Sequence, residues 1–185
     1  MLGLWIVIGV VAFLLLVGIL LYNRLVRHRQ RVNSAWSGID VQLRRRYDLI
    51  PNLVEAVKGY AAHERQLFEE VTRARAQGEA ATGVRDQAAA ENEVTRTVRQ
   101  LLAVAENYPQ LRANQNFLAL QEELSGTESK IAFSRQFYND QVQSYNVLIK
   151  AVPSNVVAGL FRFKERDFFE IDDPVARGPV AVGMS

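Results

Sequence analysis

The most constraining feature of the sequence is an uninterrupted apolar run at its start. Leu2 to Tyr22 carries no charged side chain. At about 1.5 Å of rise per residue, a helix over this run is about 31 Å long, close to the ~30 Å hydrocarbon core of a bilayer. A cleaved signal peptide is disfavoured, because no Lys or Arg precedes the run, the run is long and no small-x-small cleavage site follows it. We therefore predict a transmembrane anchor over residues 1–23.

Charge after the run predicts how the anchor is oriented. Residues 24–46 contain seven arginines and one aspartate, so the basic charge of the chain is concentrated in one band. The positive-inside rule then predicts a single pass through the inner membrane, with the N-terminus outside and the rest of the chain in the cytoplasm. A periplasmic location is the alternative if that rule fails here. The residues expected to contact anionic lipid headgroups, or to act only as the topology signal, are Arg24, Arg27, Arg29 and Arg31.

The remaining chain shows apolar residues at helical spacing. From Val32 onward they recur every three or four positions, which is typical of amphipathic helices. We predict a helix end at Pro51, with Asp48 or the pair Asn52 and Glu55 capping the next helix. Further breaks are expected at 78–86, at Pro109 as a kink or a new start, at 125–129 and at Pro153, with a short helical turn over 155–159.

Four long helices, each with one apolar stripe, must bury those stripes together. The predicted fold class is therefore all-α, with an N-terminal transmembrane helix followed by an up-and-down antiparallel four-helix bundle. The bundle is expected over residues 24–171. The Pro-, Gly- and small-residue-rich segment 172–185 is predicted to be a disordered tail.

Two long stretches of the chain resemble the LemA family. They are "YNRLVRHRQRVNSAWSGIDVQLRRRYDLIPNLVEAVKGYAAHE", residues 22–64, and the segment 105–169, which begins "AENYPQLRANQNFLALQEELSG". The resemblance implies an N-terminal transmembrane helix with a short outside N-terminus and a helical bundle on the other side. It implies no settled activity. Relatives are associated with magnetosome membrane formation, and others are found near membrane-protein quality-control or envelope genes.

The chain lacks the residue patterns of common catalytic and metal sites. It has no cysteine, which excludes a thiol nucleophile and cysteine-ligated zinc. His63–Glu64 lacks a second His at position 67, where Leu67 stands, and the other histidine is His28. We interpret His63–Glu64 as a polar pair on a helix surface. Adjacent carboxylates diverge by about 100° on a helix, so they do not converge on a metal; they are Glu69/Glu70, Glu122/Glu123 and Asp172/Asp173. We predict no catalytic residue, no metal, no cofactor and no enzyme activity.

Several polar residues fall close to the apolar stripes. Arg44, Arg45 and Arg46 spread around a helix, and the chain beyond them is acidic, so we predict a solvated or lipid-facing role and no nucleic-acid binding. Three asparagines are expected either to set register or oligomer state or to form hydrogen bonds within the bundle; they are Asn116, Asn139 and Asn146.

An aromatic cluster closes the last long segment. Phe161, Phe163, Phe168 and Phe169 are interpreted as an interaction patch or as core. Together these features predict a membrane-anchored scaffold or adaptor that recruits membrane proteins and forms homo-oligomers. A self-assembling protein that organises or remodels the membrane is the first alternative, and an enzyme with a cryptic site is the second.

Overall fold

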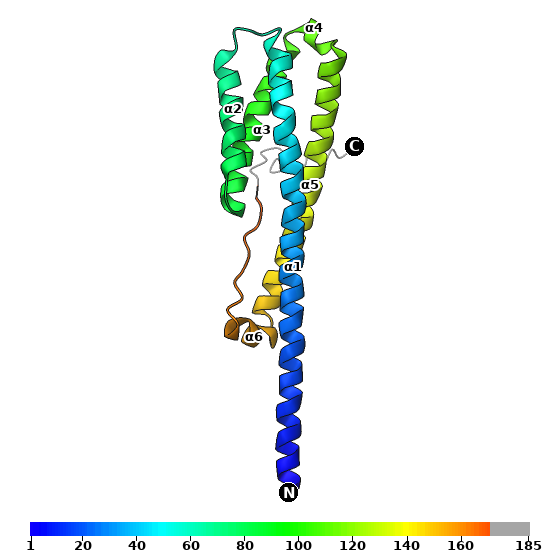
Figure 1. Ribbon diagram of the computed structural model, residues 1–185, viewed down its shortest axis with the longest axis vertical. Helices are drawn as coiled ribbons and strands as arrows, with labels where there is room; N and C mark the ends of the chain where they lie inside the picture. The colour runs from blue at the N-terminus through cyan, green and yellow to red at the C-terminus, as the bar shows by residue number, and fades with distance from the viewer. Residues whose placement is uncertain (171–185) are drawn as a thin grey trace, which may run out of the picture. The chain divides into compact units, whose positions relative to one another are not determined.

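The computed structural model describes residues 1–170, and the regular secondary structure in that range is helical throughout (Figure 1). The predicted all-α class is confirmed. The predicted tail at 172–185 lies outside the described residues. The helices are α1 (Leu2–Lys58), α2 (Arg65–Ala80), α3 (Val84–Glu106), α4 (Pro109–Arg112), α5 (Gln115–Lys150) and α6 (Ser154–Leu160).

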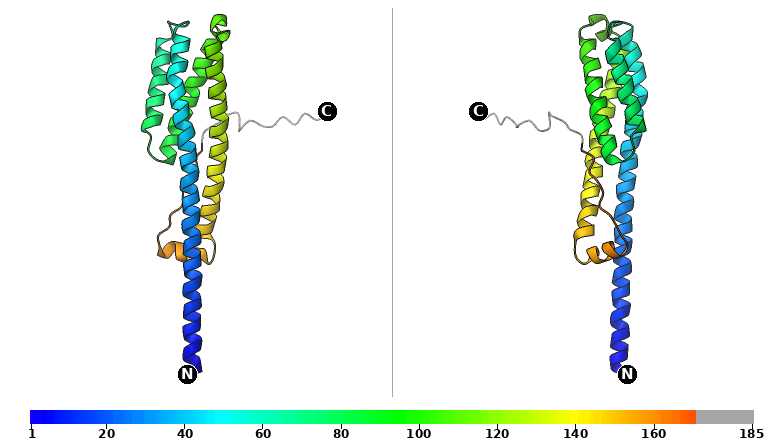
Figure 2. Two further views of the ribbon diagram at one scale, coloured as in Figure 1. Left: turned by 45° about the vertical axis from the view of Figure 1, so that its right-hand side comes forward. Right: turned by 90° about the vertical axis from the view of Figure 1, so that its left-hand side faces the viewer.

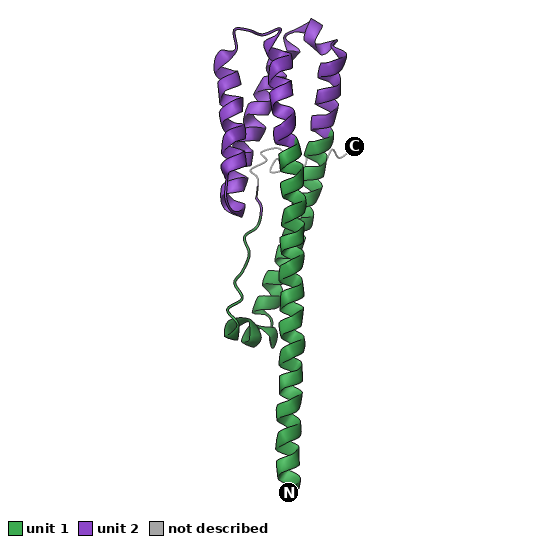
Figure 3. Ribbon diagram, in the orientation of Figure 1, with its two compact units in different colours: residues 1–45, 126–168 green, residues 46–125, 169–185 purple. Residues whose placement is uncertain are grey.

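The chain divides into two compact units, coloured separately in Figure 3. Unit 1 comprises residues 1–45 and 126–168, and unit 2 comprises residues 46–125 with the chain from 169 onward. The two long helices α1 and α5 contribute residues to both units. The predicted bundle domain at 24–171 therefore includes parts of each.

Unit 1 is built on a pair of long helices. Within it, α1 and the C-terminal part of α5 lie side by side in both views of Figure 2, and the Trp36 and Tyr138 rings are 5.4 Å apart. The apolar seams predicted for these segments are buried, which confirms their periodicity. The seam residues that are at most 3% exposed are Val32, Ile39, Leu43, Ile131, Tyr138, Val142 and Tyr145.

Unit 2 packs the last turns of α1 with α2, α3, α4 and the first turns of α5. Consecutive helices run up and down (Figure 3), joined by residues 59–64, 81–83 and 107–108. A new helix starts at Pro109, which is favoured in a helix first turn because it needs no amide partner there. The α5 helix is capped by Asn114, whose Oδ1 accepts from the backbone N–H groups of Asn116 and Phe117 at 2.9 and 3.2 Å.

The predicted helix end at Pro51 is wrong, because α1 continues through it to Lys58. A proline inside a helix lacks the N–H that would bond to the carbonyl four residues earlier, here that of Tyr47. The structure supplies another donor, since Nε of Arg75 in α2 lies 2.8 Å from that carbonyl oxygen. Tertiary packing thus replaces the lost backbone hydrogen bond. The predicted caps at Asp48 and Asn52 do not form, because no helix starts there.

Two other predicted breaks are also corrected. The loop expected over 78–86 shrinks to residues 81–83, and α5 runs without interruption through 125–129. Gly and Ser cost a helix only about 1 kcal/mol or less each relative to Ala, so buried neighbours can override them. Leu124 and Ile131, on either side of the expected break at 125–129, are both buried.

A buried polar network crosses unit 2. Arg46 and Glu91 are 1% and 0% exposed, and Nη1 of Arg46 donates to Oε2 of Glu91 at 2.8 Å. Nη2 of Arg46 donates to the hydroxyl of Thr95 at 3.0 Å, and the Tyr47 hydroxyl donates to the second Glu91 oxygen. The Gln87 amide donates to the Tyr47 hydroxyl at 2.8 Å. This network fastens α1 to α3 by charge-assisted hydrogen bonds, which are stronger than neutral ones.

The Tyr47 side chain sits between this network and α2. Burial, followed by the Glu91 carboxylate, raises the pKa of its phenol well above the ordinary value, so it stays protonated and can donate. The backbone at Gly78 leaves room for the ring. A Cβ at that position would lie 2.6 Å from the Tyr47 hydroxyl oxygen.

Replacing Gly78 with Ala should therefore destabilise the protein although Ala is the better helix former. Tyr47 is held by Glu91 and Gln87 and cannot move aside freely, so we expect a loss of about 1–3 kcal/mol from overpacking. Gly38→Ala is the matched control, because its Cβ would meet nothing within 4 Å and should stabilise α1 by up to about 1 kcal/mol. Thermal unfolding of the detergent-solubilised chain, followed by circular dichroism, measures both; equal effects would contradict the role of Gly78.

The ion pair gives a second prediction. Glu91→Gln keeps the shape of the side chain but leaves the buried Arg46 without its counter-charge, which should cost about 3–5 kcal/mol of stability. The double variant Arg46→Met/Glu91→Leu removes both charges and should be less destabilised than Glu91→Gln alone. Denaturant unfolding in detergent tests this order, and a double variant that is less stable than Glu91→Gln would contradict it.

Candidate membrane-proximal site

The N-terminal part of α1 presents apolar side chains to its surroundings. Among the described residues, α1 is the one helix that is long and apolar enough to cross a membrane, and none of its most apolar window is buried. Leu16, Ile19 and Leu20 each expose more than half of their surface. An exposed apolar surface of this length is typical of a helix that lies in an apolar medium.

Packing of α1 begins within one turn of Tyr22. Leu25 is fully buried and forms a cluster with Leu148 of α5 and Ala158 of α6. Ile149, Val157 and Phe163 are partly buried against the same cluster. The helix thus changes from an exposed apolar rod to a packed element at the point where the apolar run ends.

The four arginines that follow the run all lie on the exposed surface of α1. Arg24, Arg27, Arg29 and Arg31 alternate with the buried residues Leu25 and Val32, so the packing of one face turns the cations outward. Nε of Arg27 donates to the carbonyl of Asn23 at 3.4 Å, which leaves most of its guanidinium available. The four arginines predicted to contact headgroups are therefore exposed on α1, and the contact itself stays a prediction.

His28 lies within this arginine band. Its partial burial and then the charges of Arg31, Arg24 and Arg27 lower the pKa of the imidazole below its ordinary value. At neutral pH the histidine is therefore uncharged, and the positive charge of the band comes from the arginines. Among residues 1–170, His28 belongs to no group of three His, Cys, Asp or Glu that could hold a metal ion.

Two of the four predicted patch phenylalanines meet the end of the apolar run. The ring of Phe161 is 4.8 Å from that of Tyr22, and the ring of Phe163 is 5.8 Å from it. The Arg29 guanidinium carbon lies 5.2 Å from the centroid of the Phe163 ring, which is within cation–π range. Phe168 is part-exposed, whereas Phe169 is fully buried and belongs to the core.

The chain after α6 is fastened to α5 within unit 1. The Asn146 side chain pairs with the Arg166 backbone in both directions, each hydrogen bond 2.9 Å long. The Tyr138 hydroxyl donates to the Asp167 carbonyl at 2.9 Å, and Lys150 pairs with Glu165 at 2.9 Å. Asn146 therefore forms a hydrogen bond within the fold, which was one of its two predicted roles, whereas Asn116 is exposed.

Among the described residues, the predicted polar pair His63–Glu64 is not part of a metal-ligating group. Residues 1–170 contain no group of three His, Cys, Asp or Glu that could hold a metal ion. His63 and Glu64 lie in the loop between α1 and α2, so the prediction of a helix-surface pair is wrong. α1 ends at Lys58, immediately before Gly59, so both residues lie beyond its last turn.

Sequence reasoning misplaced Arg46 and missed Glu91. Arg46 was predicted to be solvated or lipid-facing with Arg44 and Arg45, yet it is buried, while Arg44 is exposed and pairs with Asp40 at 2.9 Å. The signal was available, because Arg46 follows Leu43 by three positions and precedes Ile50 by four. It therefore shares the apolar stripe of α1.

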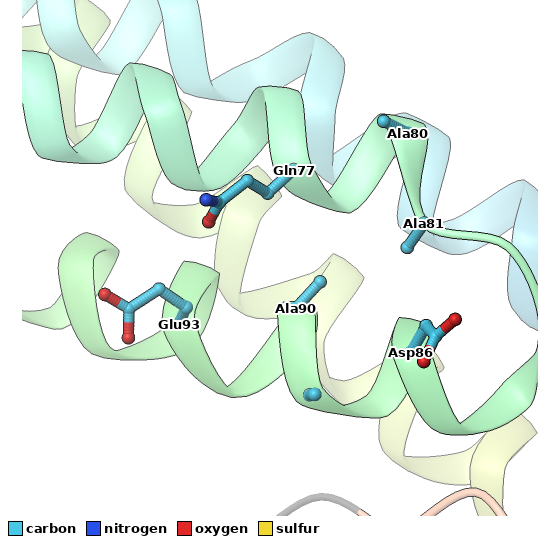
Figure 4. Close-up of a pocket in the computed structure, with 7 residues that line it drawn as sticks. Gln77, Ala80, Ala81, Asp86, Ala90 and Glu93 are labelled. Carbon is cyan, nitrogen blue, oxygen red and sulfur yellow. The ribbon is translucent and has the colours of Figure 1, made fainter.

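A shallow groove of about 460 Å³ runs between α2 and α3 (Figure 4). Its surface is formed by alanines, including Ala80, Ala81 and Ala90, and its edges carry Gln77, Asp86 and Glu93. Such a surface offers few directed polar contacts. Its lining therefore indicates no particular substrate. The groove is also shallow, whereas the pockets of most enzymes are enclosed.

Comparisons with known proteins agree with this geometry. The family model of the LemA family matches residues 35–183. Among curated proteins, Magnetosome protein MamQ 2 and Magnetosome protein MamQ 1 of Paramagnetospirillum magneticum are each 26% identical over 200 residues, covering 94% of this chain and 73% of the relative. Magnetosome protein MamQ of Magnetospirillum gryphiswaldense is 24% identical with the same coverage.

The family model begins at residue 35, beyond the apolar run, so the match depends on the packed helices and not on a generic apolar segment. It extends over the rest of α1 and all the other helices described above. With one apolar helix and this match, the protein is membrane-associated and helical. Since most of the residues in both units fall inside the match, the chain belongs to the LemA family.

Proposed function

We propose that this protein is a single-pass scaffold or adaptor of the inner membrane. Residues 2–22 span the bilayer, the arginines after Tyr22 contact anionic headgroups on the cytoplasmic side, and both units lie in the cytoplasm. The observation that carries the proposal is the continuity of α1, whose exposed apolar part runs without a break into a packed part with outward-facing arginines. Such a helix fixes a folded domain directly at the membrane surface.

A scaffold role is favoured over catalysis by the disposition of the polar groups. The carboxylate that is most deeply buried, Glu91, is bonded to Arg46, Tyr47 and Gln87, so it is occupied by structure. Large apolar side chains, in contrast, stand out on α5, where Phe133 and Phe137 are 75% and 48% exposed one helical turn apart. Exposed aromatic pairs of this kind are typical of protein-binding surfaces.

Self-assembly is the second candidate, and the relatives favour it. Their names assign them to the magnetosome, so we infer that members of this family can serve to organise a membrane. In that case the α5 aromatics would contact a further copy of the chain. An adaptor is expected to contact another membrane protein at Phe133, whereas a self-assembling protein is expected to contact a second copy of the chain there.

Orientation can be tested with single cysteines, because the chain contains none of its own. Leu2→Cys should react with a membrane-impermeant maleimide in intact spheroplasts. Gln143→Cys and Lys164→Cys, both exposed in unit 1, should react only after the inner membrane is permeabilised. The reverse pattern would place the helical units outside and overturn the cytoplasmic proposal, and labelling of all three in the soluble fraction would overturn the anchor.

The two functions are separated by a photo-crosslinking amino acid at Phe133. An adaptor should give one dominant heterologous membrane-protein adduct in cells, whereas a self-assembling protein should give an adduct at twice its own mass. The same photo-crosslinker at Gln143, an exposed polar residue of α5, is the control for random collision. Equal adduct patterns at both positions would contradict a binding surface at Phe133.

A further inference from the structure

The short helix α6 is apolar on two opposite sides. Its inner side carries Ser154 and Ala158, which are 3% and 2% exposed, and Ala158 packs on Leu25 and Leu148. Its outer side carries Val156 and Leu160, four positions apart, which are 70% and 76% exposed. A surface helix in water normally places polar residues on the face opposite the core.

The exposed apolar surface extends beyond both ends of α6. Val152, just before the helix, is 82% exposed, and Phe161, just after it, is 56% exposed. Residues 151–161 contain no charged side chain, whereas Lys150 precedes them and Arg162 and Lys164 follow. The result is a continuous apolar patch bordered by cations, which is the composition of an interfacial membrane-binding helix.

The position of α6 in unit 1 decides what covers this patch. Phe161 contacts Tyr22, the last residue of the apolar run, with ring centroids 4.8 Å apart. Ala158 packs against Leu25, which lies less than one turn further along α1. If residues 2–22 span the bilayer, Tyr22 lies at its interface, and α6 lies at the same depth (Figure 1).

The patch is also held rigidly in place. The Ser154 hydroxyl oxygen lies 2.6 Å from the Leu148 carbonyl oxygen and 2.9 Å from that of Ala151, which fixes the turn between α5 and α6. Beyond the helix, Arg29 stacks on Phe163 and Asn146 pairs with the backbone of Arg166. The backbone that carries the apolar side chains is therefore already ordered, which lowers the entropic cost of binding.

We propose that α6, together with Val152 and Phe161, is a second membrane contact that lies in the headgroup–acyl boundary beside Tyr22. Its ligand is the lipid surface, with acyl chains against Val156 and Leu160 and anionic headgroups against Arg24, Arg27, Arg162 and Lys164. The inference rests on the span proposed above and goes beyond it, because it adds a contact from the C-terminal half of the chain. Two membrane contacts would restrict the rotation and tilt of unit 1 relative to the bilayer. A single spanning helix would leave its rotation and tilt free.

A second copy of the chain is a poorer occupant of this surface. Four apolar side chains fall well short of the roughly 20–30 residues a side that a stable protein interface uses. The patch also continues directly into the apolar run of α1, so a protein partner would have to displace lipid to cover it. Contact between copies is retained as an outcome of the test.

The test uses the full-length chain in liposomes that contain phosphatidylglycerol. A polarity-sensitive nitrobenzoxadiazole probe is attached to single cysteines at Val156 or Leu160, and at two reference positions. Val11 lies inside the proposed span, and Phe133 is an exposed apolar residue of α5 outside the patch. Quenching is measured with lipids spin-labelled near the glycerol end or near the middle of the acyl chain.

We expect the probes at 156 and 160 to be quenched by the shallow label, the probe at 11 by the deep label, and the probe at 133 by neither. Quenching at 11 without quenching at 156 and 160 would overturn the second contact and leave the anchor intact. No quenching at 11 would overturn the anchor and this inference together. Disulfide-linked dimers through 156 or 160, with no quenching there, would overturn it in favour of contact between copies.

A charge-insertion variant provides an independent readout. With the probe at Phe161→Cys, the double variant Val156→Glu/Leu160→Glu should lose most of the shallow quenching. Phe133→Glu, which places one carboxylate on an equally exposed apolar residue, should keep it. Both variants alter exposed positions, so circular dichroism should show unchanged helicity, and undiminished quenching in the double variant would overturn the inference.

Discussion

One helix, α1, has to satisfy two environments, and the rest of unit 1 depends on that constraint. A segment in hydrocarbon must bond all of its backbone groups internally, which a helix does without any partner. The same helix, past Tyr22, buries Leu25, Val32, Ile39 and Leu43 against a neighbour. No loop intervenes between the two parts, so α5, α6 and the chain after them are placed relative to the apolar run by direct packing on α1.

Unit 2 meets a different physical problem, which is how to bury polar groups in an apolar bundle. Arg46 and Glu91 neutralise each other, and Tyr47, Gln87 and Thr95 form further hydrogen bonds with the pair. An apolar set of similar volume could be as stable, so the network is better understood as a device that specifies which turn of α1 faces which turn of α3. Gly78 and Arg75 of α2 complete it, one by its small size and the other by bonding the Tyr47 carbonyl.

The groups from which the function is inferred gather at the end of unit 1 where the apolar run stops. Arginines, aromatic rings and the apolar face of α6 come from segments more than a hundred residues apart in the chain, yet they gather around the end of one apolar run. Besides the surface proposed to face lipid, the protein exposes an aromatic pair at Phe133 and Phe137. Positioning other molecules at the membrane is the role that such a surface supports.

By itself, the sequence determined the features that depend on local composition and period. The apolar run, the arginine band, the helical class and the seam residues from Val32 to Tyr145 were all predictable, because burial follows a 3.6-residue repeat and membrane spans follow length. The helix ends were predictable only where no tertiary contact opposed the local signal, as at Pro109.

Tertiary structure decided the rest. Pro51 stays helical because Arg75 replaces its lost hydrogen bond, and Arg46 is buried because Glu91 meets it from a helix 45 residues away. The neighbours of α6 could not be predicted from its own seven residues, because the contact between Phe161, the residue after α6, and Tyr22 joins segments far apart in the chain.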